Sequence, residues 1–441
     1  LNVPNKGEQS QTCLGSAERK EQSPQGNVPN KRAQSQVYLN YAEHEEHLHK
    51  ENVPNLRFPE FSKSYSQTTI SKLATIVGGG TPDTTVQEYW NGGIQWFTPS
   101  EIGKKKYADK SERTISREGL SNSSAKLLPI NTILLSTRAT IGESSIAKVE
   151  CCTNQGFQSL IANEEIVCYE YLYYLVATLK KELIRKSCGS TFLEISANEV
   201  RKIKTFVPSL DEQSKVSSLL SLIDDRIATQ IKIIEKLESL IRGLITDVNS
   251  GRIAQCKSVY LRDLLTEQHE KNTNNYEVCS VSVSQGVINQ IDYLGRSFAA
   301  KEVLHYNVVN CGDIVYTKSP TGEFPYGIVK RSDITKPVAV SPLYGVYRPI
   351  NDYVGKYLHL YFKSPINAKN YLHKLIQKGA KNTINITNQH FLDNKILIPE
   401  KGWLENIVNF AAAIEMKIAT ENKVLQTLQQ QKDYLLSKMF I

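Results

Sequence analysis

Two loops, 180 positions apart, carry side chains that suit binding to a polyanion. In the first, Thr137-Arg138-Ala139-Thr140 precedes Ile141-Gly142, and in the second Thr317-Lys318-Ser319-Pro320-Thr321 precedes Gly322. An arginine can bond a guanine edge through two parallel hydrogen bonds, whereas a lysine acts as a point charge. The matched positions of Arg138 and Lys318, each flanked by hydroxyls, therefore predict two related contacts to nucleic acid.

Further polar candidates lie in the first half of the chain. Trp96, Thr98 and Ser100 precede three consecutive lysines, which could hold phosphates while the loop presents side chains to base edges. Asparagine and glutamine amides near position 155 are of the type that pairs with the N6 and N7 edge of adenine. The alternative for each candidate is structural: an indole in the core, or an amide that hydrogen-bonds a turn. The candidate DNA-binding residues are Gly80, Thr81, Trp96, Thr98, Ser100, Lys104, Lys105, Lys106, Thr137, Arg138, Thr140, Asn154, Gln155, Gln158, Thr317, Lys318, Ser319 and Thr321.

Signatures of catalysis are missing from the sequence. It has no G-x-x-x-x-G-K-[ST] phosphate loop, no G-x-S-x-G elbow, and no Asn or Asp followed by Pro-Pro and an aromatic residue, the tetrapeptide of amino-methyltransferases. In a nuclease, Asp83 and Glu101 could hold Mg²⁺ while Lys104 helps to orient water, but the Glu-x-x-Lys spacing takes Lys104 off the strand face that carries Glu101. We therefore expect no catalytic residues, no metal site and no cofactor in this chain.

Two long helical patterns are expected to position the candidate loops. Apolar residues alternate at spacings of four and three from Val216 to Val248, and again 191 positions later. A 3.5-residue apolar period is typical of a coiled coil, because each seam needs a partner helix to bury it. Gln230 and Glu421 fall at the same seam position, where a polar residue commonly fixes the register. The seam residues include Val216, Ile223, Ile234, Leu237 and Ile241 in the first helix and Ile414, Ile418, Leu425, Leu428 and Leu435 in the second.

The regions before the two helices form a repeated module. The segment from Gly189 to Pro208 and the segment from Gly379 to Pro399 both run through a strand-like stretch that ends in proline. Strands are expected at 73–77, 94–98 and 130–136, with a helix at 171–186, and then strands at 278–283, 313–316 and 344–347, with helical sequence over 353–377. The fold class predicted is α+β, with two similar modules. The predicted domains are 1–51, 52–208, 209–255, 256–399 and 400–441.

The net charge of +8 lies in the two modules. Residues 62–208 carry 18 basic and 14 acidic side chains and residues 256–399 carry 17 and 11, whereas 209–255 carry 6 and 7 and 400–441 carry 5 and 5. Basic excess on paired modules favours a polyanion bound at two places, although an excess of this size on one module alone is also ordinary surface charge.

Composition also bounds the location of the protein. The sequence has no apolar run long enough to cross a bilayer and no visible signal peptide, and its eight cysteines form no CxxC pair. We expect a cytoplasmic protein. Because the chain begins with leucine and its first methionine is Met416, we expect an alternative, processed or truncated start.

Residues 1–51 form a separate repeat with a 25-residue period, in which Asn2-Val3-Pro4-Asn5 recurs at 27–30 and 52–55. Sequence this polar cannot bury enough apolar surface to offset its ordering entropy, so a disordered tail is expected. His44, His47 and His49 lie among Glu and Lys in this tail and are interpreted as solvated rather than as metal ligands.

The order of several motifs resembles the specificity subunit (HsdS) of type I restriction-modification enzymes. The resemblance covers about residues 52–441. It rests on the lead-in NVPNLRFPEF at 52–61, GGTP at 79–82, WFTPS at 96–100, TRATIG at 137–142, NQGF at 154–157 and PSLDEQ at 208–213. The second helix departs from this pattern, since Trp403-Leu404-Glu405-Asn406 replaces Asp-Glu-Gln.

The resemblance implies two target-recognition domains separated by two long antiparallel coiled-coil helices with pseudo-twofold symmetry. Each domain would read one half of a split duplex DNA target, and the chain itself would not catalyse a reaction. The expected partners are two methyltransferase (M) subunits, which use S-adenosylmethionine, and restriction (R) subunits, which use ATP and Mg²⁺; no membrane is expected. Two alternatives stay open. A fused methyltransferase-nuclease would need an upstream Asn-Pro-Pro-Tyr sequence. A coiled-coil interaction protein would show no difference in net charge between the modules and the helices.

Overall fold

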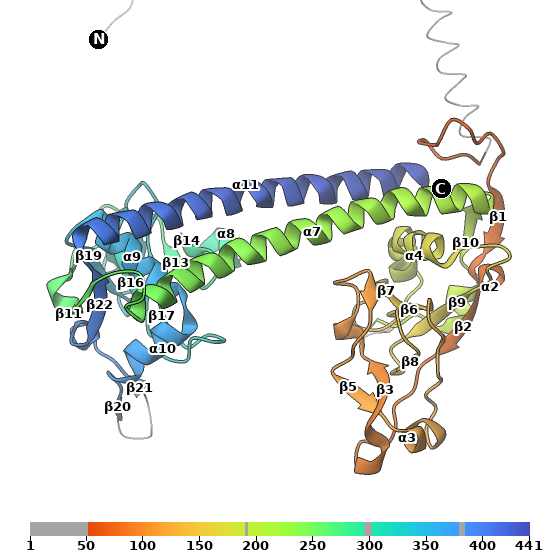
Figure 1. Cartoon of the computed structure of the whole chain (residues 1–441), viewed down its shortest axis with the longest axis horizontal. Helices are drawn as coiled ribbons and strands as arrows, with labels where there is room; N and C mark the ends of the chain where they lie inside the picture. Colours follow the sequence, from red (N-terminus) through yellow and green to blue (C-terminus); the bar gives the residue numbers. More distant parts are fainter. Residues whose placement is uncertain (1–51, 190–192, 295–301, 379–383) are drawn as a thin grey trace, which may run out of the picture. The chain divides into compact units, whose positions relative to one another are not determined.

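The computed structural model describes residues 52–189, 193–294, 302–378 and 384–441. The predicted tail and parts of both lead-in segments, 190–192 and 379–383, lie outside the described residues. Two compact units are present: one contains the described residues up to Ser214 together with 437–441, and the other contains residues 215–436 (Figure 1).

The first unit is built on two sheets. The five-stranded sheet has the order β2-β9-β6-β7-β4, and the three-stranded sheet has the order β5-β3-β8, with β3 parallel to β8. A third pairing joins β1 to β10. The strands are β1 (Ser66–Thr69), β2 (Ala74–Gly78), β3 (Trp90–Phe97), β4 (Tyr107–Ala108), β5 (Arg113–Ile115), β6 (Ile133–Leu135), β7 (Ser144–Ala147), β8 (Cys151–Thr153), β9 (Gln158–Ala162) and β10 (Lys204–Val207). The helices are α2 (Ile70–Leu73), α3 (Arg117–Ser121), α4 (Tyr169–Thr178), α5 (Lys180–Arg185) and α6 (Ala197–Arg201), with short 3-10 turns at Gln87–Tyr89 and Pro99–Glu101.

The second unit repeats this plan with shorter sheets. Its four-stranded sheet has the order β12-β19-β16-β17, and β11 pairs with β22. The strands are β11 (Cys256–Tyr260), β12 (Leu265–Glu267), β13 (Cys279–Ser282), β14 (Gly286–Asn289), β15 (Asn307–Val309), β16 (Ile314–Thr317), β17 (Ile328–Arg331), β18 (Val338–Val340), β19 (Gly345–Pro349), β20 (Gln377–Lys378), β21 (Ile384–Asn385) and β22 (Lys395–Pro399). The helices are α8 (Gln290–Leu294), α9 (Asp352–Lys363) and α10 (Pro365–His373), with 3-10 turns at Leu261–Asp263 and His390–Leu392.

Strand order shows that the two modules have the same topology. The order β2-β9-β6-β7 in the first unit corresponds to β12-β19-β16-β17 in the second, and β2 and β12 begin 191 positions apart. The pairing of β1 with β10 corresponds to that of β11 with β22. The parallel pairing of β3 with β8 corresponds to a parallel bridge between Val278 and Ala339. The predicted α+β fold with two similar modules is therefore confirmed.

Each unit has an apolar core with aromatic side chains. In the first, Phe97 and Phe157 are fully buried with Leu134, and Trp90 packs edge-on against Trp96 at 5.1 Å between ring centroids. In the second, Phe391 stacks on Tyr316 at 4.6 Å and on Tyr347 at 4.9 Å. A fully buried side chain of this size stabilises the fold by about 1.5–3 kcal/mol, so these residues fix the strands that carry the loops.

Four predicted elements differ in the structure. Leu73 ends helix α2 instead of beginning a strand, and the strand predicted at 130–136 shortens to β6 because Asn131, at φ 65°, makes a turn that leaves Ile130 56% exposed. The predicted helix 171–186 divides at Leu179 into α4 and α5. The helical stretch 353–377 divides at Ser364, whose extended backbone is typical of a residue before proline.

The two long helices, α7 (Leu210–Asn249) and α11 (Lys401–Met439), pack side by side along the predicted seam (Figure 1). Each predicted seam residue is buried or partly buried in the structure. The helices are antiparallel, since the Gln230 amide donates to the backbone oxygen of Glu421 at 3.1 Å while Asp224 pairs with Lys432 at 2.7 Å. Gln230 and Glu421 are 191 positions apart, as are the repeats. A position that contacts its own repeat lies on the pseudo-twofold axis of the helix pair.

Candidate nucleic-acid interface

The Gly-Gly-Thr-Pro turn is held against the end of strand β8. Gly80 N donates to the Thr153 carbonyl at 2.8 Å, and the Trp96 indole N–H donates to the Gly80 carbonyl at 2.9 Å. A Cβ atom at Gly79 would lie 1.9 Å from the Asn154 carbonyl oxygen, so only glycine allows this close approach. The turn therefore presents Thr81 beside residues 154–156, and the Thr81 hydroxyl donates to the Gln155 amide oxygen.

The loop that contains Arg138 joins the antiparallel strands β6 and β7. Ser136 N donates to the Glu143 carbonyl at 2.9 Å and Gly142 N donates to the Ser136 carbonyl at 3.0 Å, which closes the loop. At its tip Thr140 N donates to the Arg138 carbonyl at 2.7 Å, and Ala139 has φ 62°. A hydrogen bond between residues two apart defines a γ-turn, and the positive-φ form is rare and strained. The turn leaves the Arg138 side chain 47% exposed.

Contacts between loops bring most of the predicted residues of the first unit together. A Cβ atom placed on Gly156 would lie 3.0 Å from Pro99 Cγ and 3.7 Å from Arg138 Cβ. The loop around Arg138 therefore lies next to both the 98–100 and the 154–156 segments. Gly103 lies against the Glu143 side chain, which places the lysine run beside the same loop. The partly or fully exposed members of this cluster are Thr81, Thr98, Ser100, Lys104, Lys105, Arg138, Thr140, Asn154 and Gln155.

Other predicted residues of the first unit have structural positions. Trp96 is only 4% exposed and Thr137 is fully buried, and Gly80 is buried beneath Ser124 and Ala125. Lys106 pairs with Glu170 at 3.5 Å and lies near the rings of Tyr107 and Tyr174. Gln158 is part of β9, paired with Gly78. For Trp96 the structural alternative accounts for its contacts, since its N–H holds the glycine turn that presents Thr81.

The carboxylates of the nuclease alternative are engaged elsewhere. Glu101 accepts hydrogen bonds from Thr98 N and from Glu112 N, each at 2.7 Å, and so caps its own short helix. Asp83 accepts from Thr85 N at 2.9 Å and from the Thr85 hydroxyl at 2.7 Å, and these bonds lower the pKa of Asp83. Within the described residues, no group of three or more His, Cys, Asp or Glu lies close enough to hold a metal ion.

The second unit carries the matched loop between β16 and β17. Lys318, Ser319 and Thr321 are exposed, whereas Thr317 is 2% exposed and belongs to the strand. Thr321 and Phe324 exchange backbone hydrogen bonds at 3.1 and 2.9 Å, which narrows the loop tip. Thus both modules place a basic side chain at the start of the same hairpin loop.

Glu212 and Gln213, from the motif at the start of α7, lie inside the first unit. The Glu212 carboxylate, 1% exposed, accepts from Arg57 Nε and Nη2, both at 2.7 Å, and from the Tyr65 hydroxyl at 3.2 Å. Gln213 donates to the Ile166 and Pro208 carbonyls at 2.9 and 3.0 Å. At the corresponding positions 191 residues on, Trp403 is half-exposed and Leu404 is buried. The departure at 403–406 therefore replaces an internal polar contact.

Glu194 was not among the predicted site residues, yet its carboxylate lies beside the Arg138 guanidinium, with 3.8 Å between Oε2 and Nε. The two residues also form an antiparallel backbone bridge. The sequence alone offers no signal for this pair because 56 positions separate its members.

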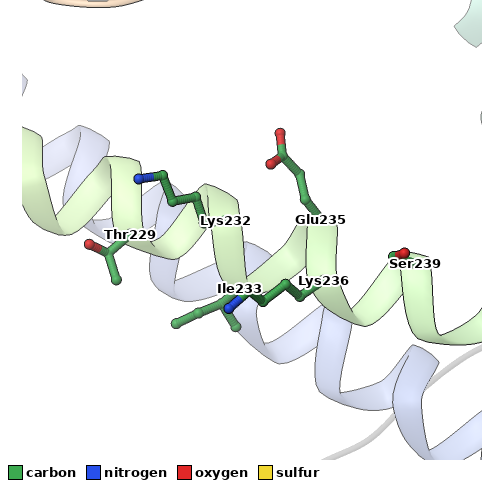
Figure 2. Close-up of a pocket in the computed structure, with 6 residues that line it drawn as sticks. All are labelled: Thr229, Lys232, Ile233, Glu235, Lys236 and Ser239. Carbon is green, nitrogen blue, oxygen red and sulfur yellow. The ribbon is translucent and has the colours of Figure 1, made fainter.

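The helix pair presents apolar side chains to solvent. A shallow groove on α7 is lined by Thr229, Lys232, Ile233, Glu235, Lys236 and Ser239, and Figure 2 shows the Lys232 and Glu235 side chains extending from the helix on the same side. Other exposed apolar residues on α7 include Leu222, Ile231 and Leu240, and those on α11 include Phe410, Met416 and Val424. No helix among the described residues is long and apolar enough to span a membrane.

Comparison with known proteins bears on the first unit and on α7 as far as residue 239. Residues 63–239 match the family model described as the type I restriction modification DNA specificity domain. This stretch therefore resembles a type I restriction-modification DNA specificity domain. The chain is 37% identical to the MjaIX specificity subunit of Methanocaldococcus jannaschii over 182 residues, and this match covers 40% of the chain and 42% of that relative. Over 204 residues it is 28% identical to the EcoR124I/EcoR124II specificity subunit of Escherichia coli, covering 45% and 47%. The matched part thus spans less than half the length of these relatives.

Solved structures extend the likeness in fold beyond residues 63–239. The S subunit of a type I restriction-modification system from M. genitalium aligns with a TM-score of 0.52 and 13% identity, covering 88% of this chain and 99% of that chain. A chain from a structural study of type I R-M complex assembly aligns with a TM-score of 0.51 and 14% identity, covering 85% and 97%. At these identities the likeness shows that the fold is shared.

Proposed function

We propose that this chain is the specificity subunit of a type I restriction-modification complex, in which each unit reads one half of a split duplex DNA target. The observation that carries the proposal is the repeated hairpin loop, with Arg138 exposed between β6 and β7 and Lys318 exposed between β16 and β17. One fold used twice, with different residues in the loops, suits one task performed on two different half-sites. The net charges of the modules, +4 and +6, favour the same ligand.

The chemistry in this proposal belongs to other subunits. The chain supplies recognition and no catalytic group, while two methyltransferase subunits would bind S-adenosylmethionine and restriction subunits would use ATP and Mg²⁺. The α7 groove around Ile233 supports docking of a protein partner, because an apolar groove rimmed by polar side chains commonly marks an interaction site. A complex of this kind would act on DNA in the cytoplasm.

The test is co-expression of the chain with neighbouring methyltransferase genes, followed by co-purification and mapping of methylated adenines. The expected result is a stable complex that methylates one bipartite motif. Arg138→Ala and Lys318→Ala should then each relax recognition of a different half-site, by about 1–3 kcal/mol if the side chain meets a base edge.

Two results would oppose the proposal. A chain that methylates DNA without partners would favour the fused enzyme, and a complex that forms but shows no sequence preference would favour a coiled-coil interaction protein. Equal losses on target and scrambled DNA for both substitutions would make Arg138 and Lys318 phosphate contacts.

A further inference from the structure

We infer that Glu194 is a positioning residue that sets DNA specificity by holding Arg138 until a matching base edge replaces it. The inference rests on the proposed function and deepens it at one loop. The Glu194 carboxylate lies 3.8 Å from Arg138 Nε, and both side chains are 47% exposed. The guanidinium thus faces an anion of the protein, while about half of the Arg138 side chain stays open to solvent.

The backbone holds the two side chains next to each other. Arg138 and Glu194 form an antiparallel bridge, and Ile195 N donates to the Thr137 carbonyl at 3.1 Å. On its other side Glu194 exchanges backbone hydrogen bonds with Cys188 at 2.9 and 3.0 Å. Because these bonds involve main-chain atoms only, the carboxylate can be changed without loss of the bridge.

The γ-turn after Arg138 gives the loop a defined conformation. Ala139 has φ 62°, which residues with a Cβ seldom adopt, and the Arg138 carbonyl accepts from both Thr140 N at 2.7 Å and the Ser136 hydroxyl at 3.1 Å. Backbone strain of this kind persists only where the surroundings enforce it, and it is concentrated at ligand-binding loops. The loop therefore presents Arg138 from a fixed backbone position, so that the side chain alone has to exchange partners.

The ion pair between Arg138 and Glu194 is weak enough for a base edge to replace the carboxylate. An exposed pair at this separation contributes little, typically below about 1 kcal/mol, so a guanine edge that accepts two hydrogen bonds can displace the carboxylate. Where no such edge is present, Arg138 stays with Glu194, which offsets its positive charge and keeps it from binding phosphates of any sequence. Specificity then arises because the carboxylate weakens binding to the wrong duplex, while the guanine edge strengthens binding to the target.

The test is Glu194→Gln in the full chain purified with its partners, with affinity measured for the mapped target and for a scrambled duplex of equal length. The variant keeps size and backbone and removes the charge. Affinity for the scrambled duplex should rise about 3- to 10-fold, while affinity for the target should change less than about two-fold. Glu199→Gln is the matched control, since Glu199 pairs with Lys202 and Lys186, and it should leave the ratio of the two affinities unchanged.

A double-mutant cycle separates positioning from general charge. In an Arg138→Ala background, Glu194→Gln should no longer change the ratio, because its effect acts through Arg138. An equal rise in scrambled-duplex affinity in that background would overturn the inference, as would an unchanged ratio in a Glu194→Gln protein that melts at the wild-type temperature. A wild-type protein with no preference for any duplex would instead refute the proposed function.

Discussion

Removal of the Arg57 side chain should destabilise the first unit more than removal of an exposed ion pair does. Arg57→Ala would leave the Glu212 carboxylate, 1% exposed, with the Tyr65 hydroxyl at 3.2 Å as its remaining side-chain donor in the described structure. Breaking a buried pair by removing one partner costs about 3–5 kcal/mol, because the other charge stays buried without compensation. For a unit of this size, each kcal/mol lowers the melting temperature by about 2–4 °C, so a decrease of roughly 6–20 °C is expected.

The assay is calorimetry of the full chain, with hydrogen exchange to identify which unit unfolds first. The variant should lose protection at Leu56, whose N–H donates to the Lys438 carbonyl at 2.8 Å, and along β1, while β12 to β19 keep theirs. Arg185→Ala is the matched control, because Arg185 is 75% exposed and pairs with Glu182 at 2.6 Å. That change should lower stability by less than about 1 kcal/mol. If Arg57→Ala and Arg185→Ala lower the melting temperature equally, the argument from burial is wrong.

Three further predictions concern pH, salt and helix length. Burial and the neighbouring Lys330, Lys363 and Arg331 lower the pKa of His359 to about 3. As pH falls, His359 is therefore protonated in the unfolded chain, near pH 6.5, before it is protonated in the folded one. The second unit should lose stability as pH falls from about 6.5 towards 3. His359→Asn keeps an acceptor for Arg331 N and should make denaturation midpoints flatter over this range; identical pH profiles would contradict the role of His359. The logarithm of DNA affinity should fall with the logarithm of salt concentration, with a slope of about −0.9 for each neutralised phosphate. Lys105→Ala should make this slope shallower by about 0.9, the loss of one phosphate contact. Binding that does not change with salt would show that phosphate contacts do not contribute. Deleting residues 234–240 together with 411–417, their counterpart across the seam, keeps the heptad phase and shortens the helix pair by about 10 Å, so the spacer between methylated half-sites should lose about three base pairs. An unchanged spacer in a complex that still methylates DNA would show that helix length does not set it.

Features with a regular period were predictable from the sequence. The seam between the two long helices follows from the heptad pattern, and the matched topology of the modules follows from the 191-residue repeat, since both patterns can be seen in residue types at regular spacing. Contacts between distant residues were not predictable. The Arg57–Glu212 pair joins positions 155 apart, and the Arg138–Glu194 pair depends on a backbone bridge that leaves no mark in residue types. Trp96 shows the limit at the site, because an indole before a lysine run suits a DNA contact as well as the core position it occupies.

The first unit is discontinuous in sequence, and this has a consequence for its synthesis. Phe440 stacks on Tyr171 with ring centroids 5.0 Å apart, and residues 437–441 belong to the unit that otherwise ends at Ser214. At translation rates of about 5–20 residues per second, the intervening 222 residues take roughly 10–45 s to make. Throughout that interval the ring of Tyr171 lacks its stacking partner and the Leu56 N–H lacks its acceptor. The module made first is thus the last to be completed, and a nascent chain stalled within the second unit would expose an unfinished first unit to chaperones and proteases.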